Sequence, residues 1–112
     1  YCTSILTAVA PSAGLSAADI LAGRTGNSED RRTKAALAFA HNVLESRGKV
    51  SDQQLTAVRS AGFSDADIVE IVASVVLGCL TNFLNNVADT ELDFPRAEAV
   101  ATCSISNGEA AT

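Results

Sequence analysis

A chain of 112 residues allows one domain, and its 47% of hydrophobic residues supply enough apolar material for a core. Bulk must come from Leu, Ile, Val and Ala, because aromatic residues make up only 4% and Trp is absent. The net charge of −5 argues against electrostatic binding to nucleic acid or to anionic lipid. We therefore expect neither nucleic acid nor a membrane among the partners.

The predicted elements are all helical. No segment alternates apolar and polar residues strictly, and the β-branched residues fall inside segments with helical periodicity. The sequence therefore predicts an all-α fold, with a helical domain over residues 1–92 and an extended or mobile tail over residues 93–112. In chain order the predicted helices cover residues 1–10, 16–23, 28–47, 51–61 and 64–88.

Helix ends are indicated by capping residues. Ser16 with Asp19 three residues later resembles a capping box, and Ser28 is expected to cap the third helix. Arg47 and Gly48 are typical of the end of that helix, because glycine adopts the left-handed conformation that stops a helix.

The last helix contains the most apolar stretch, residues 68–80. These 13 residues are too few to span a bilayer, so we expect a buried core helix. The helix is also apolar on more faces than one small domain covers, which indicates a homo-oligomer.

Two segments repeat each other. Residues 13–20 and 61–68 match at six of eight positions with an offset of 48. Each places a glycine, an apolar residue and a serine cap between two helices. Either the chain contains a duplicated helix–turn–helix unit, or the match reflects a common helix–glycine–helix turn.

Three cysteines, Cys2, Cys79 and Cys103, are too few and too far apart for a disulfide scaffold or a zinc site. We expect reduced thiols and a cytoplasmic location. Cys79 follows Gly78 in the most apolar helix and is expected to be inert core, and Cys103 is expected to be an exposed thiol in the tail.

Cys2 is the first candidate for chemistry. It lies at the start of a predicted helix, where unpaired amides favour the thiolate, which is the reactive form of cysteine. The alternative is a small buried cysteine without reactivity.

Tyr1-Cys2, the two repeated segments and the stretch Leu-Thr-Asn-Phe-Leu-Asn-Asn-Val-Ala-Asp-Thr-Glu-Leu-Asp at residues 80–93 resemble the alkylhydroperoxidase D-like and carboxymuconolactone decarboxylase-like family. The resemblance covers residues 1–93 and implies a helical bundle with an internally repeated helix–turn–helix unit. It also implies a homotrimer or homohexamer. In the family, a cysteine matching Cys2 attacks a hydroperoxide.

The same resemblance places the resolving cysteine three positions before Cys2 and a proton-relaying Glu further upstream. Because the chain begins Tyr1-Cys2 and contains no Met, we expect residues upstream of Tyr1. The implied activity is thiol-dependent hydroperoxide reduction, with a small hydroperoxide and a thiol reductant as partners. It needs no cofactor, because sulfur carries the redox change.

Two positions depart from the family. Leu6 stands where the relay His would be, and Asn86 replaces a second His near the end of the last helix. Asn86 is kept as a candidate pocket residue. His41, the only His, is either a substitute relay for Cys2 or a boundary residue that faces water. A non-catalytic oligomeric scaffold and an acid–base enzyme of the decarboxylase branch therefore stay open as alternatives.

Overall fold

The computed structural model describes residues 1–100, and in this range it contains helices and no strand. The prediction of an all-α fold is confirmed for the described part of the chain. The helices are α1 (Cys2–Val9), the short 3₁₀ helix η1 (Ala10–Ala13), α2 (Ala17–Arg24), α3 (Arg31–Ser46), α4 (Asp52–Ser60) and α5 (Asp65–Ala88).

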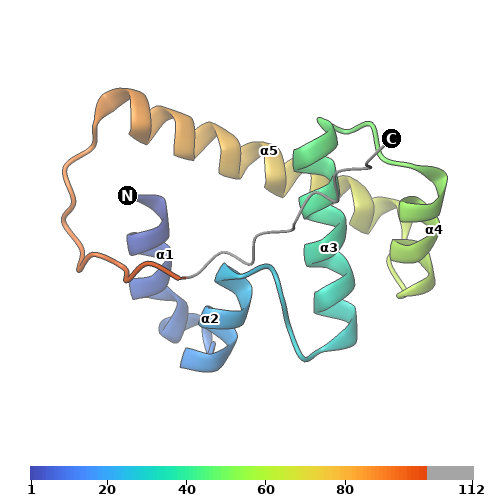
Figure 1. The fold of residues 1–112 in the computed structure, drawn as a ribbon, viewed down its shortest axis with the longest axis horizontal. Helices are drawn as coiled ribbons and strands as arrows, with labels where there is room; N and C mark the ends of the chain where they lie inside the picture. Colours follow the sequence, from blue (N-terminus) through green and yellow to red (C-terminus); the bar gives the residue numbers. More distant parts are fainter. Residues whose placement is uncertain (101–112) are drawn as a thin grey trace, which may run out of the picture.

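Helix α5 joins two groups of helices (Figure 1). Its N-terminal half packs with α3, which also contacts α4, and its C-terminal half passes over α1. After α5 the chain turns back and runs beside α1 and α2 as an extended segment. The N-terminus of α1 therefore lies below the C-terminal half of α5.

The apolar core lies in the α3–α4–α5 group. Phe39 and Val43 from α3, Val58 from α4 and Ile68 from α5 are its buried residues. Partly buried side chains surround them, namely Val50, Leu55, Phe63, Ile71, Val72 and Val75. No buried apolar residue of the described range comes from α1 or α2.

The prediction that α5 is a buried core helix is wrong for the single chain. Ile68 is its one buried residue, because α3 and α1 each cover only part of its circumference. The length argument against a bilayer is also wrong, since α5 has 24 residues and is long and apolar enough to cross a membrane. One such helix is weak evidence for a membrane protein, because core helices of soluble proteins have the same length and composition.

Serine caps determine where three of the helices begin. Ser16 accepts the backbone N–H of Asp19 at 3.1 Å, and Ser64 accepts that of Asp67 at 3.1 Å. Each aspartate in turn accepts the backbone N–H of its serine, which completes a capping box. These hydrogen bonds lower the pKa of both aspartates. Helix α4 begins with a third box, formed by Ser51 and Gln54.

Helix α3 begins later than expected. Asp30, rather than Ser28, is its N-cap, and the Asp30 carboxylate accepts the backbone N–H of Thr33 at 2.7 Å. The hydroxyl of Ser28 instead accepts the backbone N–H of Asp30. Arg47 ends the helix in the left-handed conformation and Gly48 follows with positive φ, so the predicted end is confirmed.

The two repeated segments form turns of the same local geometry. Gly14 and Gly62 have φ angles of 85° and 96°, and Ser16 and Ser64 then cap the next helix. The surroundings differ, because a 3₁₀ helix precedes the first turn and α4 precedes the second. The following helices have 8 and 24 residues. Shared turn geometry is therefore observed, and duplication of a larger unit stays a hypothesis.

The predicted tail falls partly in the described range. Residues 90–100 contain no helix and run extended along α1 and α2, to which they are hydrogen-bonded. The rest of the tail, including Cys103, lies outside the described residues.

Candidate functional site

Cys2 is the first residue of α1, as the sequence predicts, and its side chain is partly buried. The preceding Tyr1 makes no side-chain hydrogen bond to the helix start. The thiol belongs to the first turn of α1, on the side of this helix that α5 covers.

Asn85 of α5 contacts the thiol directly. Its side-chain Nδ2 lies 3.4 Å from the Cys2 Sγ and 2.8 Å from the backbone oxygen of Thr81. A carbonyl oxygen only accepts hydrogen bonds, so the amide nitrogen must face Thr81. The second hydrogen of the same NH₂ group then points to the sulfur. Asn85 is thus held by its own helix as a hydrogen-bond donor to Cys2.

Residues 93–98, which we call the strap, run along α1 and α2 and are hydrogen-bonded to one residue of each helix. The buried hydroxyl of Ser4, which is 7% exposed, accepts the backbone N–H of Ala97 at 3.0 Å. The guanidinium of Arg24 in α2 donates to the backbone oxygen of Glu98. Ser4 is the one buried polar residue of the described range, which shows how closely the strap lies against α1.

Tyr1 ties the strap to the N-terminus of α1. A hydrogen bond to the Asp93 carboxylate raises the pKa of the Tyr1 phenol, and slight burial and the negative charges of Asp93 and Cys2 add to the shift. The phenol therefore stays protonated and acts as a hydrogen-bond donor at neutral pH.

Leu6 lies one helical turn after Cys2 and is 64% exposed. Together with residues of α2 it lines an open pocket of about 300 Å³. The position that the resemblance assigns to a relay His therefore faces an open pocket between α1 and α2, and Cys2 is not among the residues that line this pocket. Other residues lining this pocket include Thr3, Thr7, Ile20 and Arg24.

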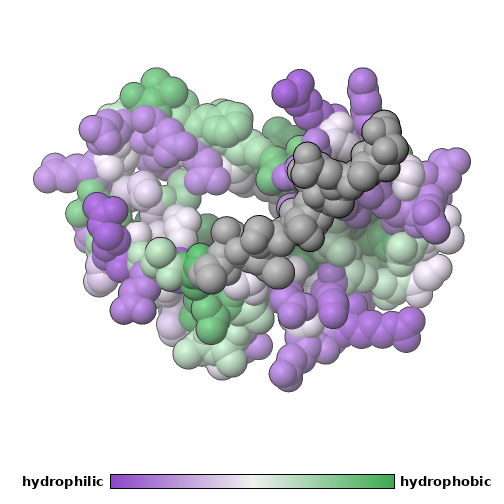
Figure 2. Space-filling view, viewed as in Figure 1, coloured by the Kyte–Doolittle hydropathy of each residue, from purple (hydrophilic) through white to green (hydrophobic). Residues whose placement is uncertain are grey.

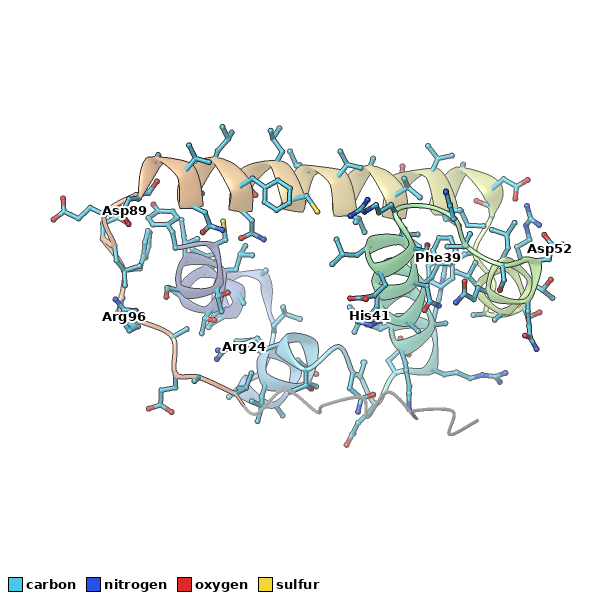
Figure 3. The ribbon with its side chains drawn as sticks, turned by 45° about the horizontal axis from the view of Figure 1, so that its top comes forward. Arg24, Phe39, His41, Asp52, Asp89 and Arg96 are labelled. Atoms are coloured by element: carbon cyan, nitrogen blue, oxygen red, sulfur yellow. The ribbon has the colours of Figure 1, made fainter. Side chains whose placement is uncertain are left out.

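His41 and Asn86 are not brought to Cys2. His41 is exposed on α3, which belongs to the other helix group (Figure 3). Asn86 is exposed on α5, and its neighbour Asn85 makes the contact with the thiol. The structure thus brings together Cys2 and Asn85, and the predicted roles of His41 and Asn86 stay predictions.

Cys79 is not a core residue, contrary to expectation. Its side chain is partly exposed and lines a groove of about 470 Å³ between α3 and α5. The groove also contains Val43, Arg47, Val76 and Phe83. The reason is that α3 ends at Ser46, so nothing of α3 continues along α5 beyond this point.

Sequence reasoning missed Ser4 and singled out Asn86 in place of Asn85. The signal for an amide near the thiol was present, because residues 85 and 86 are adjacent asparagines in an apolar helix. No sequence signal indicated that Ser4 is a strap contact. Among residues 1–100 no group of three or more Cys, His, Asp or Glu side chains is arranged to hold a metal ion.

Comparison with known protein families, with curated proteins and with solved structures finds no match for this chain. The resemblance to the alkylhydroperoxidase D-like family stays a prediction that rests on the residues quoted for it.

Proposed function

We propose that the chain is a thiol-dependent hydroperoxide reductase in which Cys2 is the attacking thiol. The observation that carries the proposal is the distance of 3.4 Å between the Cys2 sulfur and the amide nitrogen of Asn85, which its own helix holds in place. A donated hydrogen bond stabilises negative charge on sulfur. The thiolate is the form that attacks peroxides.

The reaction balances without a cofactor. The Cys2 thiolate attacks the terminal oxygen of a hydroperoxide, the O–O bond breaks, and the products are a sulfenic acid and an alkoxide that takes a proton to become an alcohol. A second thiol then attacks the sulfenic sulfur, giving a disulfide and water. A further reductant thiol releases Cys2, so two reductant thiols are oxidised for each hydroperoxide.

The protein offers no imidazole for the proton steps. Leu6 occupies the position one turn after Cys2, and the single His lies on α3. Assistance from an imidazole beside Cys2, which is worth about 10²- to 10⁴-fold, is therefore absent, and the alkoxide takes its proton from solvent or another acid. We expect slow turnover with a small hydroperoxide and a dithiol reductant.

The resolving thiol has two possible sources. The resemblance places one three positions before Cys2, and a reductant thiol serves equally well. Cys79 belongs to the groove beside α3 rather than to the α1 site. It therefore serves as a control cysteine and not as a resolving partner.

The test compares two variants in the whole chain. In the first, Cys79→Ser and Cys103→Ser leave Cys2 as the single thiol of this sequence; in the second, Cys2→Ser removes it. Peroxide is added with a sulfenic-acid trap, and adducts are mapped by mass spectrometry while peroxide loss is followed. We expect adducts and peroxide loss with the first variant and neither with the second.

A non-catalytic scaffold is the second candidate, favoured by the exposed Leu6 where a relay would stand. If Cys2→Ser leaves peroxide loss unchanged and Cys2 forms no adduct, the reductase proposal fails and the scaffold takes its place. The decarboxylase alternative needs a titratable His near the site, and the placement of His41 on α3 does not favour it.

A further inference from the structure

Helix α5 carries an apolar seam that is largely exposed in the single chain. Its members follow one another at spacings of four and three residues, which is the pattern that pairs helices in coiled coils. The large seam side chains are all more than half exposed. The seam consists of Val69, Ala73, Val76, Leu80, Phe83 and Val87.

The seam lies beside the faces that α5 uses inside the chain, and Val76 and Phe83 at its edge also line the groove between α3 and α5. Ile68 and Val75 face the core with α3, and Asn85 faces α1. The seam residues lie on a third face. Val69 and Val76 each follow a core residue, Ile68 or Val75, by one position, which turns them about 100° around the helix. The other seam residues lie three or four positions from one another along the same face. Side chains of α5 stand out on the side away from α1 and α3 (Figure 3), and apolar surface is visible along α5 in the space-filling view (Figure 2).

The exposed area is larger than a folded monomer of this size should have. The chain exposes 8640 Å², whereas a compact chain of 11.5 kDa exposes about 5,800 Å². Even if the twelve residues outside the described range contributed as much as an unfolded segment, about 1,800 Å², roughly 1,000 Å² would remain in excess. A standard interface buries about 800 Å² on each partner.

The charges around α5 argue against lipid as the covering medium. Residues 71–88 contain no charged side chain, but acidic residues stand on both sides. Helices that enter bilayers are anchored by Lys, Arg, Trp and Tyr at their ends. None of these occurs between residues 64 and 95. The flanking acids are Asp65, Asp67 and Glu70 before the uncharged stretch and Asp89, Glu91 and Asp93 after it.

We propose that the α5 seam packs against the α5 seam of a second copy of this chain. The occupant must present an uncharged apolar helix face with the same spacing over about five turns, and this chain itself presents one. An isologous contact covers both seams at once. The pairing does not depend on the reactivity of Cys2, because Asn85 and the thiol lie on a different face of α5.

The same charges give the contact a recognisable salt dependence. Two α5 helices side by side bring acidic ends of the two copies near one another, in parallel or in antiparallel orientation. Salt screens this repulsion, since the Debye length falls from about 10 Å at 0.1 M to about 3 Å at 1 M. Association should therefore become stronger as salt rises.

The test measures the mass of the whole chain by sedimentation from about 0.1 to 100 µM, at low and high salt. We expect a multiple of the chain mass that dissociates on dilution, and tighter association at high salt. Leu80→Glu places a charge in the centre of the seam and should weaken association at least tenfold. Asn82→Glu adds the same charge to the same helix at an exposed position outside the seam and should leave it unchanged.

Four results overturn the proposal, the last of them a thermal midpoint that is independent of protein concentration. The first is a mass of one chain at 100 µM, and the second is an oligomer that Leu80→Glu does not weaken. The third is a monomer that binds neutral phosphatidylcholine vesicles through α5, which would make lipid the occupant. Because Leu80→Glu can also fail to fold, the thermal midpoint of the unaltered chain is measured as well. It should rise with protein concentration if folding and association are coupled, and a constant midpoint contradicts the proposal.

Discussion

Removal of the Asn85 amide should slow the chemistry of Cys2 without destabilising the protein. In Asn85→Ala the donor that lies 3.4 Å from the sulfur is lost. Alanine is the best helix former, so α5 itself should not weaken. A slower reaction would then report on the lost hydrogen bond rather than on unfolding.

The magnitude follows from the geometry of the contact. The sulfur is partly buried and the N–H···S contact is long, so we use the ordinary net value for a hydrogen bond, about 0.5–1.5 kcal/mol. Since about 1.4 kcal/mol corresponds to a factor of ten, the reaction should slow about two- to tenfold. Asn85→Asp keeps the shape but replaces the donor by a negative charge, so the loss should be about tenfold or more.

The assay is the rate at which iodoacetamide alkylates Cys2 at pH 7, measured by mass spectrometry on the peptide that contains it. Asn86→Ala is the matched control, because this neighbouring asparagine is exposed and should have no effect. Alkylation of Cys79 in the same samples reports any general loosening of the structure. If Asn85→Ala and Asn86→Ala react at the same rate, the amide does not activate the thiol.

Four further outcomes are expected. Leu6→His should raise peroxide reduction by about ten- to a hundredfold, because the imidazole would lie one turn from Cys2 in open space; an unchanged rate in steady-state assays would contradict this. Ser64→Ala should cost about 1 kcal/mol in the free energy of unfolding. Hydrogen bonds to Ser64 lower the pKa of Asp67, so they stabilise the folded protein while Asp67 is charged. The loss of unfolding free energy in Ser64→Ala should therefore be complete above about pH 4 and should shrink as the pH falls through the folded-state pKa of Asp67. Thermal midpoints of both proteins from pH 6 to 3 measure this loss. Phe39→Ala should cost about 3–5 kcal/mol in chemical denaturation, since Phe39 is 3% exposed; a cost below 1 kcal/mol would place the core elsewhere. Amide protons of α1 and α2 should exchange at least about tenfold faster than those of α3, and equal protection by hydrogen-exchange mass spectrometry would refute this.

Helix ends were predictable where one residue type fits one role. Ser64 precedes α5, and the predicted end at residue 88 agrees with Asp89 as the left-handed C-cap. The start of α3 was not predictable in the same way. Ser28 and Asp30 are both good N-caps, and local preference alone does not decide between them. The structure uses both side chains, with Asp30 capping the helix and Ser28 holding the backbone of Asp30.

The choice between Asn85 and Asn86 shows why site contacts are harder to predict than helices. Asn86 was singled out because the resemblance places a His there, and it also continues the helical face that carries Ile68, Val75 and Cys79. However, α3 does not extend that far along α5, and α1 packs on a different face. The contact between Asn85 and Cys2 joins residues 83 positions apart. Such a contact depends on where α1 packs, which no local pattern determines.

The α3–α4–α5 group and the thiol end of the molecule are stabilised by different interactions. All the buried apolar residues of the described range belong to α3, α4 and the start of α5. The thiol end is fixed by polar contacts, namely those of Asn85 with Cys2, of Ser4 with Ala97 and of Arg24 with Glu98. A partly exposed hydrogen bond contributes only about 0.5–1.5 kcal/mol, so these contacts open more readily than an apolar core does. Such opening suits the proposed reaction, because the sulfenic sulfur of Cys2 must become accessible to a second thiol after it has reacted beneath α5 and the strap.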